Sequence, residues 1–504
     1  MVFFLALCSN FVFGQNKKKV LYYASISMDS TTKMLLKESN TQSFCKNNLL
    51  LLEDYQKFSR QVVSYYENNG FPFVEVRLDS LKMEADSASA RLTIDKHEYI
   101  VFDSIIVSGT AKLSSSYIYP YLGWRRKKPY RESVVEDIPS KLAELPFVSE
   151  IKPSAIEFIN DKCYLYLYLD KRKTCQFDGY IGLVPVDERT GKVSVNGEVN
   201  LNLKNLFKIG EQIDLQWRST ERFSQFLNVH LNFPYLFKTP FGVDGQFILD
   251  KKDTSYLSMN YEIGLQYSML GNSYVKAYFD YTSSNVLSPS LLVADTSFQC
   301  IDYRKSMYGI EFNIRKLDYV FNPRKGFSLV VNGSVGNRKI VKNAKASDAL
   351  YEGLPMSRVN YRLNVAVQGF IPLYKRWVFV LGVNGGTLFG NKHYMNELYR
   401  IGGVNSLQGF DEKAIYCSSY AIASAEVRFL FAKRSYINAF FNAAWYERAL
   451  IDSYLRDIPF GFGLGLSFDT KAGMFYLSYA LGKQFNNPIS FKSGKIHFGV
   501  KIGF

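Results

Sequence analysis

The sequence predicts a closed antiparallel β-barrel that spans a membrane, preceded by two small α+β domains. Three observations support this fold class. From Cys175 onward, helical periodicity disappears and apolar residues alternate with polar ones, which is typical of strands with two unlike faces. The strands are about ten residues long, the length that a tilted strand needs to cross a bilayer. The 504 residues contain 36 Tyr, 40 Phe and 34 Gly but only 15 Pro, as expected for many strands.

The composition excludes several other classes. A hydrophobic content of 47% is too high for a disordered chain. Beyond the N-terminus, no apolar run approaches the ~18 residues of a membrane-spanning helix. A formal net charge of +15 would also suit a nucleic-acid-binding protein, so the charge decides nothing by itself. The six cysteines are scattered and the four histidines lie far apart, so we predict no disulfide framework, metal site or cofactor.

Residues 1–15 (MVFFLALCSNFVFGQ) carry no charge and precede three lysines. This apolar stretch is typical of a secretory signal peptide that is cleaved near Gly14 or Gln15. It lacks the usual basic start, and a short buried helix is the alternative. Cys8 is not expected to carry a lipid, because Leu7 precedes it where a small residue is required. We therefore expect export, which together with the lack of a nucleic-acid motif argues against a nucleic-acid partner.

The first domain is expected over residues 16–97. Residues 49–69 predict a helix with five large side chains on one face, namely Leu51, Tyr55, Phe58, Val62 and Tyr66. Gly70 ends this helix, and strands follow at 71–76 and 90–94.

A second domain is expected over residues 98–174. Its elements are a strand at 99–107, helices at 114–123 and 132–145, and strands at 151–158 and 163–169. Both domains are expected to have the order strand–helix–helix–strand–strand, which resembles the polypeptide-transport-associated (POTRA) domain. The phrases NNGFPFVEV and LAELPFVSEI occupy positions that resemble that family's helix-to-strand turns, and the first domain is the poorer match.

The barrel is expected over residues 175–504, with sixteen strands. Alternation is clearest at 192–203, 227–233, 359–367 and 495–504. The polar faces carry Arg, Lys, His, Asp and Asn, which a wet lumen allows and which argues against a soluble sandwich. Long connections at 288–305, 341–355 and 391–417 follow odd-numbered strands, whereas tight turns follow even-numbered ones. A closed barrel is the all-β arrangement that satisfies its backbone hydrogen bonds in lipid.

Three phrases resemble motifs of the outer-membrane assembly and secretion superfamily that includes BamA-, TamA- and two-partner-secretion-type proteins. RIGG followed by LQGF resembles the family's lumen-loop motif, through Arg400, Gly402, Gly403, Leu407, Gln408, Gly409 and Phe410. The segment with Asp318, Pro323 and Gly326 resembles its periplasmic turn. GLGLSFDTKAG at 463–473 resembles the strand that receives the loop tip, through Gly463, Gly465 and Asp469.

Gln408 departs from the family motif, which carries arginine at this position. Asp469 alternates onto the polar side of its strand, so we expect it to face Gln408. A neutral hydrogen bond of roughly 0.5–1.5 kcal/mol would then replace a charge-assisted pair of roughly 1.5–3 kcal/mol. The sequence therefore predicts a loosely held loop and a higher melting temperature for Gln408→Arg. A polar loop tip with no particular partner is the alternative.

The resemblance implies a protein-assembly or translocation barrel in the bacterial outer membrane, with the two domains in the periplasm. Its seam would lie where the first strand, near 176–185, meets the last, at 495–504. Gly499 and Gly503 either weaken packing there or fit the strand against the lumen loop. An open seam would offer an edge that a client strand can join. Phe504 resembles the terminal signal by which such barrels are themselves inserted.

The resemblance also implies partners. These are outer-membrane lipids including lipopolysaccharide, unfolded or partly folded client proteins, and periplasmic or lipoprotein accessory subunits. The basic run at 125–128 is expected to be a solvated turn, with a contact to anionic headgroups or to the barrel rim as the alternative. A two-partner-secretion export pore is the main alternative, since a passive porin would not explain the N-terminal domains. No enzyme is expected, because His230 and His497 have no recognisable nucleophile beside them.

Overall fold

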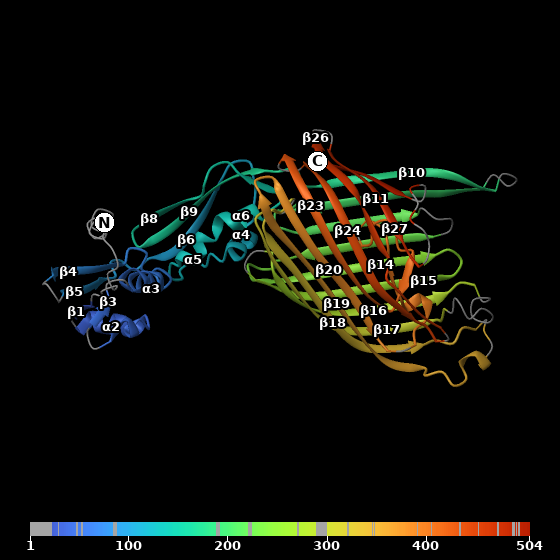
Figure 1. Cartoon of the computed structure of the whole chain (residues 1–504), viewed down its shortest axis with the longest axis horizontal. Coiled ribbons are helices and arrows are strands. Elements are labelled where there is room, and N and C mark those ends of the chain that lie inside the picture. Colours follow the sequence, from blue (N-terminus) through green and yellow to red (C-terminus); the bar gives the residue numbers. More distant parts are fainter. Residues whose placement is uncertain are drawn as a thin grey trace, which may run out of the picture. The chain divides into compact units, whose positions relative to one another are not determined.

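The computed structural model of the chain (Figure 1) describes residues 23–503 with gaps. The gaps are 29, 47–48, 52–53, 84–87, 188–191, 220–223, 270–271, 289–299, 320–321, 345, 347, 391, 405, 433–434, 452, 471–472, 486–488, 490 and 492–493. The expected signal peptide at 1–15 and the terminal Phe504 lie outside the described residues.

Contacts divide the chain into two compact units. The first unit combines the residues up to Ile106 with Arg125–Asp137 and Ala155–Tyr166. The second combines Val107–Trp124, Ile138–Ser154 and Leu167–Phe504. The region expected as the second domain is therefore shared between the two units.

The N-terminal part of the first unit is a five-stranded sheet with two helices packed on it. The sheet has the order β2-β3-β1-β5-β4. Its strands are β1 (Tyr23–Ser27), β2 (Cys45–Lys46), β3 (Leu49–Leu51), β4 (Glu75–Met83) and β5 (Ala88–Asp95), and its helices are α2 (Ser30–Glu38) and α3 (Tyr55–Glu67). Strand β4 pairs with β5 and forms one end of this sheet.

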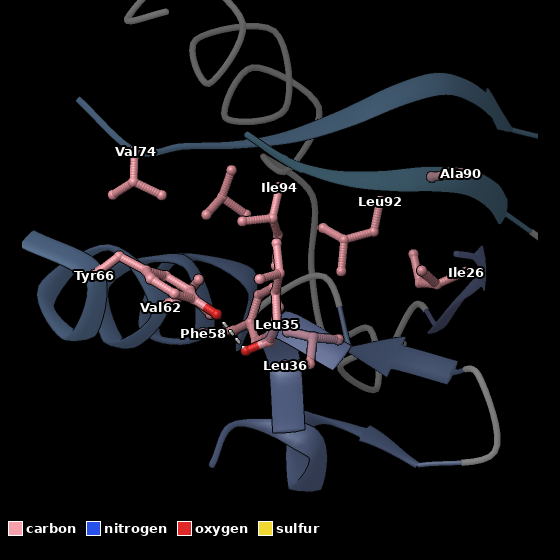
Figure 2. Close-up of a cluster of buried hydrophobic side chains, with 11 residues drawn as sticks. Ile26, Leu35, Leu36, Phe58, Val62, Tyr66, Val74, Ala90, Leu92 and Ile94 are labelled. Atoms are coloured by element: carbon pink, nitrogen blue, oxygen red, sulfur yellow. Dashed lines mark hydrogen bonds between the residues drawn. The ribbon is translucent and has the colours of Figure 1, made fainter. Parts of the chain in front are cut away.

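The core of this region lies between α3 and the strands β4 and β5 (Figure 2). Phe58, Val62 and Tyr66 are spaced four residues apart, so they share one helix face, and all three are buried. The Tyr66 hydroxyl donates a hydrogen bond of 2.7 Å to the Leu35 carbonyl, which ties α3 to α2.

The helix predicted at 49–69 is shorter than expected. Residues Leu49–Leu51 form β3, which pairs antiparallel with β1, and the helix begins only at Tyr55. A short apolar run fits a buried strand as well as a helix, and pairing with a distant strand decides between the two. The β2–β3 hairpin was not predicted, so this region contains more strands than the expected order of strand–helix–helix–strand–strand.

Residues 98–174 form seven elements. They are β6 (Val101–Ser108), α4 (Ser115–Leu122), α5 (Glu132–Glu136), α6 (Ile138–Ala143), β7 (Val148–Glu150), β8 (Ala155–Ile159) and β9 (Lys162–Lys171). The Ser114 hydroxyl accepts a hydrogen bond from the backbone N–H of Ser116 at the start of α4, and Gly123 ends that helix with a φ of 80°.

The single helix predicted at 132–145 is two helices. Helix α5 ends at Glu136, with Asp137 as its C-cap, and α6 starts at Ile138. Pro139 explains the break, because proline has no N–H to donate to the carbonyl of Val135 and its ring would collide with that carbonyl in a continuous helix.

The second unit contains the closed antiparallel barrel (Figure 1). Its strands are β10 (Gln176–Asp187), β11 (Lys192–Lys204), β12 (Gln212–Ser219), β13 (Gln225–Phe233), β14 (Phe241–Lys252), β15 (Tyr256–Ser268), β16 (Tyr274–Val286), β17 (Tyr303–Leu317), β18 (Gly326–Ile340), β19 (Ser357–Tyr374), β20 (Trp377–Phe389), β23 (Ser419–Ala432), β24 (Ser435–Ala449), β25 (Tyr454–Asp457), β26 (Phe460–Thr470), β27 (Gly473–Lys483) and β28 (Lys495–Gly503). We call the end where β10 begins the entry end and the opposite end the far end.

Seventeen named strands occupy sixteen positions around this barrel, counted over the described residues. Strands β25 and β26 both pair with β24, β25 at its far end and β26 along the rest, so they are two pieces of one interrupted strand. The interruption includes Pro459, which has no N–H for the ladder. The predicted fold class and its sixteen-strand barrel are confirmed.

The two faces of the barrel wall differ as the alternation predicts. On β15, Leu265 is 68% exposed on the outer face, whereas the neighbouring Gln266 is 2% exposed on the inner face. Apolar side chains dominate the outer face of β17 and β19 in the same way, including Tyr308, Ile310, Tyr361 and Leu363. This outer surface matches the hydrocarbon of a bilayer. In the part of the chain that the structure covers, no helix has the length and apolar character needed to cross a membrane.

Candidate functional site: the barrel seam and the lumen loop

The barrel closes between its first and last strands with little pairing. Among the described residues, strands β10 and β28 pair at two positions, Gln176 with Gly503 and Phe177 with Ile502. On their other sides, β28 pairs with β27 at seven positions and β10 pairs with β11 at eleven. From Asp178 onward, the β10 edge that faces β28 therefore has no strand partner among the described residues. Gly499 is paired with Tyr476 of β27, whereas Gly503 belongs to the short contact with β10.

On the N-terminal side of the seam, the lumen wall is held together by paired charges. Lys276 of β16 contacts Asp244 at 2.9 Å and Glu262 at 2.8 Å. His230, predicted on the lumen face, lies there between Asp214 and Asp244, at 3.4 and 2.8 Å. A buried charge is costly unless it is paired, and each of these has a partner on a neighbouring strand. This side of the barrel is thus tied together across β12 to β16.

Loops at the far end fold back into the barrel. The connection after β20 contains the short helix η5 (Met395–Glu397), in which the Asn396 amide donates to the Ser284 hydroxyl of β16 at 2.8 Å. Arg338 of β18 pairs with Glu397 at 2.9 Å, and both side chains are buried. Apolar residues of three loops and strand ends pack around them, namely Ile301, Tyr303, Ile340, Tyr351 and Tyr394. These residues form a roof over part of the far end of the lumen.

The RIGG and LQGF phrases lie on a hairpin inside this same connection. Strands β21 (Tyr399–Ile401) and β22 (Ile415–Cys417) form its arms. Arg400 donates to the Lys413 carbonyl at 3.1 Å and pairs with Asp250 of β14 at 3.4 Å. Leu407 is fully buried in an apolar cluster with Ile401 and Ile415. The motif residues therefore hold the hairpin together and fix it to the wall.

Close backbone packing places the loop tip on the C-terminal strands. Gly409 has a φ of 95°, and a Cβ on it would lie 2.8 Å from the Leu481 carbonyl of β27. The Gln408 carbonyl lies against Gly461 of β26, and the Phe410 ring lies against Gly482 of β27. Glycine is needed here because any side chain would separate the two backbones.

The glycines that receive the loop differ from the predicted ones. A Cβ on Gly463 would meet Tyr479 and Phe440, and one on Gly465 would meet Asn438, so these two glycines pack against neighbouring strands and not against the loop. Gly461 and Gly482 were missed by sequence reasoning. They are paired in the register of β26 and β27, which local patterns do not reveal.

The expected contact between Gln408 and Asp469 is wrong. Gln408 lies at Gly461, and Asp469 is eight residues further along β26, or about 26 Å away. The Gln408 amide donates instead to the Val404 carbonyl at 3.5 Å and interacts with Tyr476 of β27. The Asp469 backbone N–H donates to Ser435 at the entry end. Alternation placed both residues on lumen faces but could not give their depth.

A guanidinium near the loop tip comes from the barrel wall and was also missed. Arg428 of β23 donates to both carboxylate oxygens of Glu426, at 2.8 and 2.9 Å. Its guanidinium also lies 4.8 Å from the centre of the Tyr436 ring. Glu426, Arg428 and Gln408 line one lumen cavity of about 920 Å³, and so does His497. A carboxylate and a guanidinium are therefore already paired beside the glutamine.

The predicted turn motif lies at the entry end, between β17 and β18. The Asp318 carboxylate accepts hydrogen bonds from the backbone N–H groups of Arg324 and Lys325, at 2.9 and 3.1 Å. Pro323 is buried, and Gly326 starts β18 with a φ of 121°. The Arg324 side chain donates to the Lys375 carbonyl of the β19–β20 turn. The motif thus joins two adjacent turns.

Two segments of the upstream region pack on the entry-end turns. We call Val107–Trp124 and Ile138–Ser154 the collar. Tyr117 of α4 lies edge-on to Tyr235 of the β13–β14 turn, with ring centres 5.4 Å apart, and Gly210 lies against the Tyr117 ring. The Asn272 backbone N–H donates to the Glu144 carboxylate at 3.2 Å. Burial raises the pKa of the Tyr117 phenol well above its ordinary value.

This architecture defines a class of protein, a transmembrane barrel with a weakly paired seam, an inward-folded loop and an upstream domain region. The model of the Omp85 superfamily domain matches residues 205–504, and the chain belongs to this superfamily. Barrels of this superfamily lie in the bacterial outer membrane and serve the insertion or translocation of proteins. Among the described residues, no group of three His, Cys, Asp or Glu side chains could hold a metal ion.

Three solved structures are similar to this chain at low sequence identity, and the two with TM-scores above 0.5 share its fold. CdiB from Escherichia coli is 14% identical, with 98% of this chain and 93% of that chain covered and a TM-score of 0.59. CdiB from Acinetobacter baumannii is 13% identical, with 97% and 91% covered and a TM-score of 0.55. BamA from Haemophilus ducreyi lacking POTRA domains 1–3 is 16% identical, with 95% and 98% covered and a TM-score of 0.47. A comparison with curated proteins gave no match.

Proposed function

We propose that this chain inserts client β-strand proteins into the outer membrane through the seam between β10 and β28. This proposal is supported by the short pairing at the seam. The described residues of β10 and β28 pair at two positions, whereas β28 pairs with β27 at seven and β10 pairs with β11 at eleven. An unpaired strand edge in lipid is costly, so a client strand that pairs with β10 is stabilised by main-chain hydrogen bonds. No catalytic residue takes part.

The roof at the far end favours a lateral route over a route through the lumen. A polypeptide that leaves through the far end would have to displace the buried Arg338–Glu397 pair and the hydrogen bonds of Asn396. Separating a buried ion pair costs about 3–5 kcal/mol. A two-partner-secretion export pore, which uses the lumen, is the second candidate, and the low-identity likeness to CdiB supports its fold alone.

We further propose that residues 16–97 and 98–174 are POTRA domains in the periplasm, where they receive clients and accessory subunits. Strand β4 is the feature that supports this role. It lies at one end of its sheet, so its outer edge is available for pairing with an extended client segment. The basic turn at 125–128 is exposed and is proposed to contact anionic headgroups, including those of lipopolysaccharide.

A disulfide across the seam tests lateral insertion. Phe177→Cys and Ile502→Cys place two thiols at a paired position, in a background without the native cysteines. The oxidised barrel in liposomes should lose client assembly, and a reductant should restore it. A control lock, Leu215→Cys with Val229→Cys, joins β12 to β13 at an equivalent paired position and should leave assembly intact. Undiminished assembly with the seam locked would overturn the lateral route and favour the export pore.

A further inference from the structure

The hairpin inside the barrel touches strands on both sides of the seam. On the N-terminal side, Glu412 pairs with Arg218 of β12 at 3.8 Å, and the Lys413 ammonium lies 3.5 Å from the centre of the Phe226 ring of β13. Arg400 of the same hairpin pairs with Asp250 of β14. One face of the loop tip is therefore bound to the strands that follow β10.

The loop residues just before Glu412 and Lys413 bind the C-terminal strands. Asp411 pairs with Lys495, the first residue of β28, at 2.7 Å. Gly409 packs on Leu481 and Gly482 of β27, and the Gln408 carbonyl packs on Gly461 of β26. Six consecutive residues, 408–413, thus connect β26, β27 and β28 with β12 and β13.

From this arrangement we infer that residues 408–413 form a strap that holds β28 in position against β10. The inference rests on the proposed role of the seam and adds its regulation. Two register pairs alone give β28 little attachment to β10, so contacts made from inside the barrel decide how often the seam is closed. The Asp411–Lys495 pair grips β28 at its far end, whereas its register pairs with β10 lie at the entry end. The strap and the paired positions therefore hold opposite ends of one strand.

The strap makes two kinds of contact with the C-terminal strands, and these contacts differ in strength. Asp411 and Lys495 are 72% and 39% exposed, and ion pairs of this kind are weak and screened by salt. The glycine contacts of Gln408 and Gly409 are backbone-to-backbone and are not sensitive to salt. Release of β28 can therefore occur at the Asp411–Lys495 pair while the loop stays attached to β26 and β27.

The rate of disulfide formation between Phe177→Cys and Ile502→Cys measures seam closure without any client. Asp411→Lys places two like charges together and should slow this rate by about two- to fivefold, within the range expected for an exposed ion pair. Combining Asp411→Lys with Lys495→Asp should restore the rate. Asp348→Lys is the matched control, because Asp348 forms an exposed pair of the same 2.7 Å length with Lys342, away from the seam.

An unchanged rate in Asp411→Lys, or an equal loss in Asp348→Lys, would overturn the strap. Failure of the double charge reversal to restore the rate would overturn it as well. These outcomes are separate from those for lateral insertion. If locking the seam abolishes client assembly while Asp411→Lys leaves the rate unchanged, the seam functions without a strap. If Asp411→Lys slows the rate while locking leaves assembly intact, the strap holds a seam that clients do not use.

Discussion

At the scale of the residue, the guanidinium in the cavity that Gln408 lines belongs to the barrel wall and not to the loop. The superfamily-like motif places a guanidinium at the loop tip, and this chain has Arg428 on the neighbouring wall, paired with Glu426 through both oxygens. Bidentate pairing with Arg428 satisfies the Glu426 carboxylate. The chain therefore keeps a charge-assisted contact in this cavity, although the loop itself contributes a neutral amide.

Gln408→Arg should consequently not raise the melting temperature of the barrel, contrary to the expectation from sequence. The new guanidinium would face Arg428 and an already paired carboxylate, so repulsion offsets any gain. In a chain that carries Arg428→Gln, the same Gln408→Arg change should be stabilising, because Glu426 then loses both hydrogen bonds from Arg428. Heat-induced unfolding of the four chains followed by circular dichroism measures this coupling. A rise in the single variant would restore the original expectation.

Gly409 is a residue at which we expect a single methyl group to weaken the attachment of the loop to β27. A Cβ there would lie 2.8–2.9 Å from the backbone of Leu481 and Gly482, and the residue has a φ of 95°. Gly409→Ala should therefore destabilise the attached loop by about 1–3 kcal/mol. Gly333→Ala is the control, since a Cβ at Gly333 meets nothing within 4 Å. Limited proteolysis of the 390–418 loop in both variants distinguishes the two effects.

Lys413 gives the loop a dependence on pH. Burial lowers the pKa of its ammonium from the ordinary value near 10.5 to about 8, and Arg218 and Arg400 lower it further while Asp250 and Glu412 oppose this shift. Between these two pH values the folded state binds fewer protons than the unfolded state, so stability rises as the pH rises. Wild type should therefore gain stability from pH 8 to pH 10.5 relative to Lys413→Met. Equal urea midpoints for the two chains across this range would contradict the assignment.

At the scale of the element, the strands were predictable and the contacts between elements were not. Alternation over ten or more residues identifies a barrel strand because one face meets lipid and the other meets water. The helices gave less secure limits. Leu49–Leu51 forms a strand because it pairs with β1. Pro139 separates two helices where periodicity predicted a single helix. Local patterns thus predicted whether a segment is a strand or a helix wherever each face of that segment meets the same surroundings along its whole length.

The collar is the element whose attachment we expect to depend on one aromatic contact. Tyr235→Ala removes the ring that lies edge-on to Tyr117 and should weaken the attachment of α4 by roughly 3 kcal/mol. Hydrogen exchange of residues 115–122 should then become faster. Phe237→Ala in the same turn is the control, because that ring is 91% exposed and its loss should leave exchange unchanged. Similar exchange in the two variants would mean that Tyr235 does not hold the collar.

At the scale of the whole molecule, closure of the barrel determines which distant residues meet. Gly461 and Gly482 receive the loop because β26 and β27 pair in one register and because the hairpin after β20 turns inward. Neither fact is present in a local pattern. Asp469 was misplaced for the same reason. Alternation predicts which face of a strand a residue lies on, but the pairing register around the barrel decides how far along the lumen that residue lies. The seam was predictable because the first and last strands of a closed barrel are necessarily neighbours.

The roof at the far end has a consequence for the membrane as a barrier. A wide aqueous barrel would admit solutes that the outer membrane normally excludes, and a cell that keeps many such barrels would lose that protection. Buried side chains such as Tyr303 and Tyr394, together with the Arg338–Glu397 pair, obstruct this passage while the protein is idle. The lateral opening proposed above would expose a strand edge to lipid and leave this roof in place. The roof therefore narrows the aqueous path at the part of the far end that it covers.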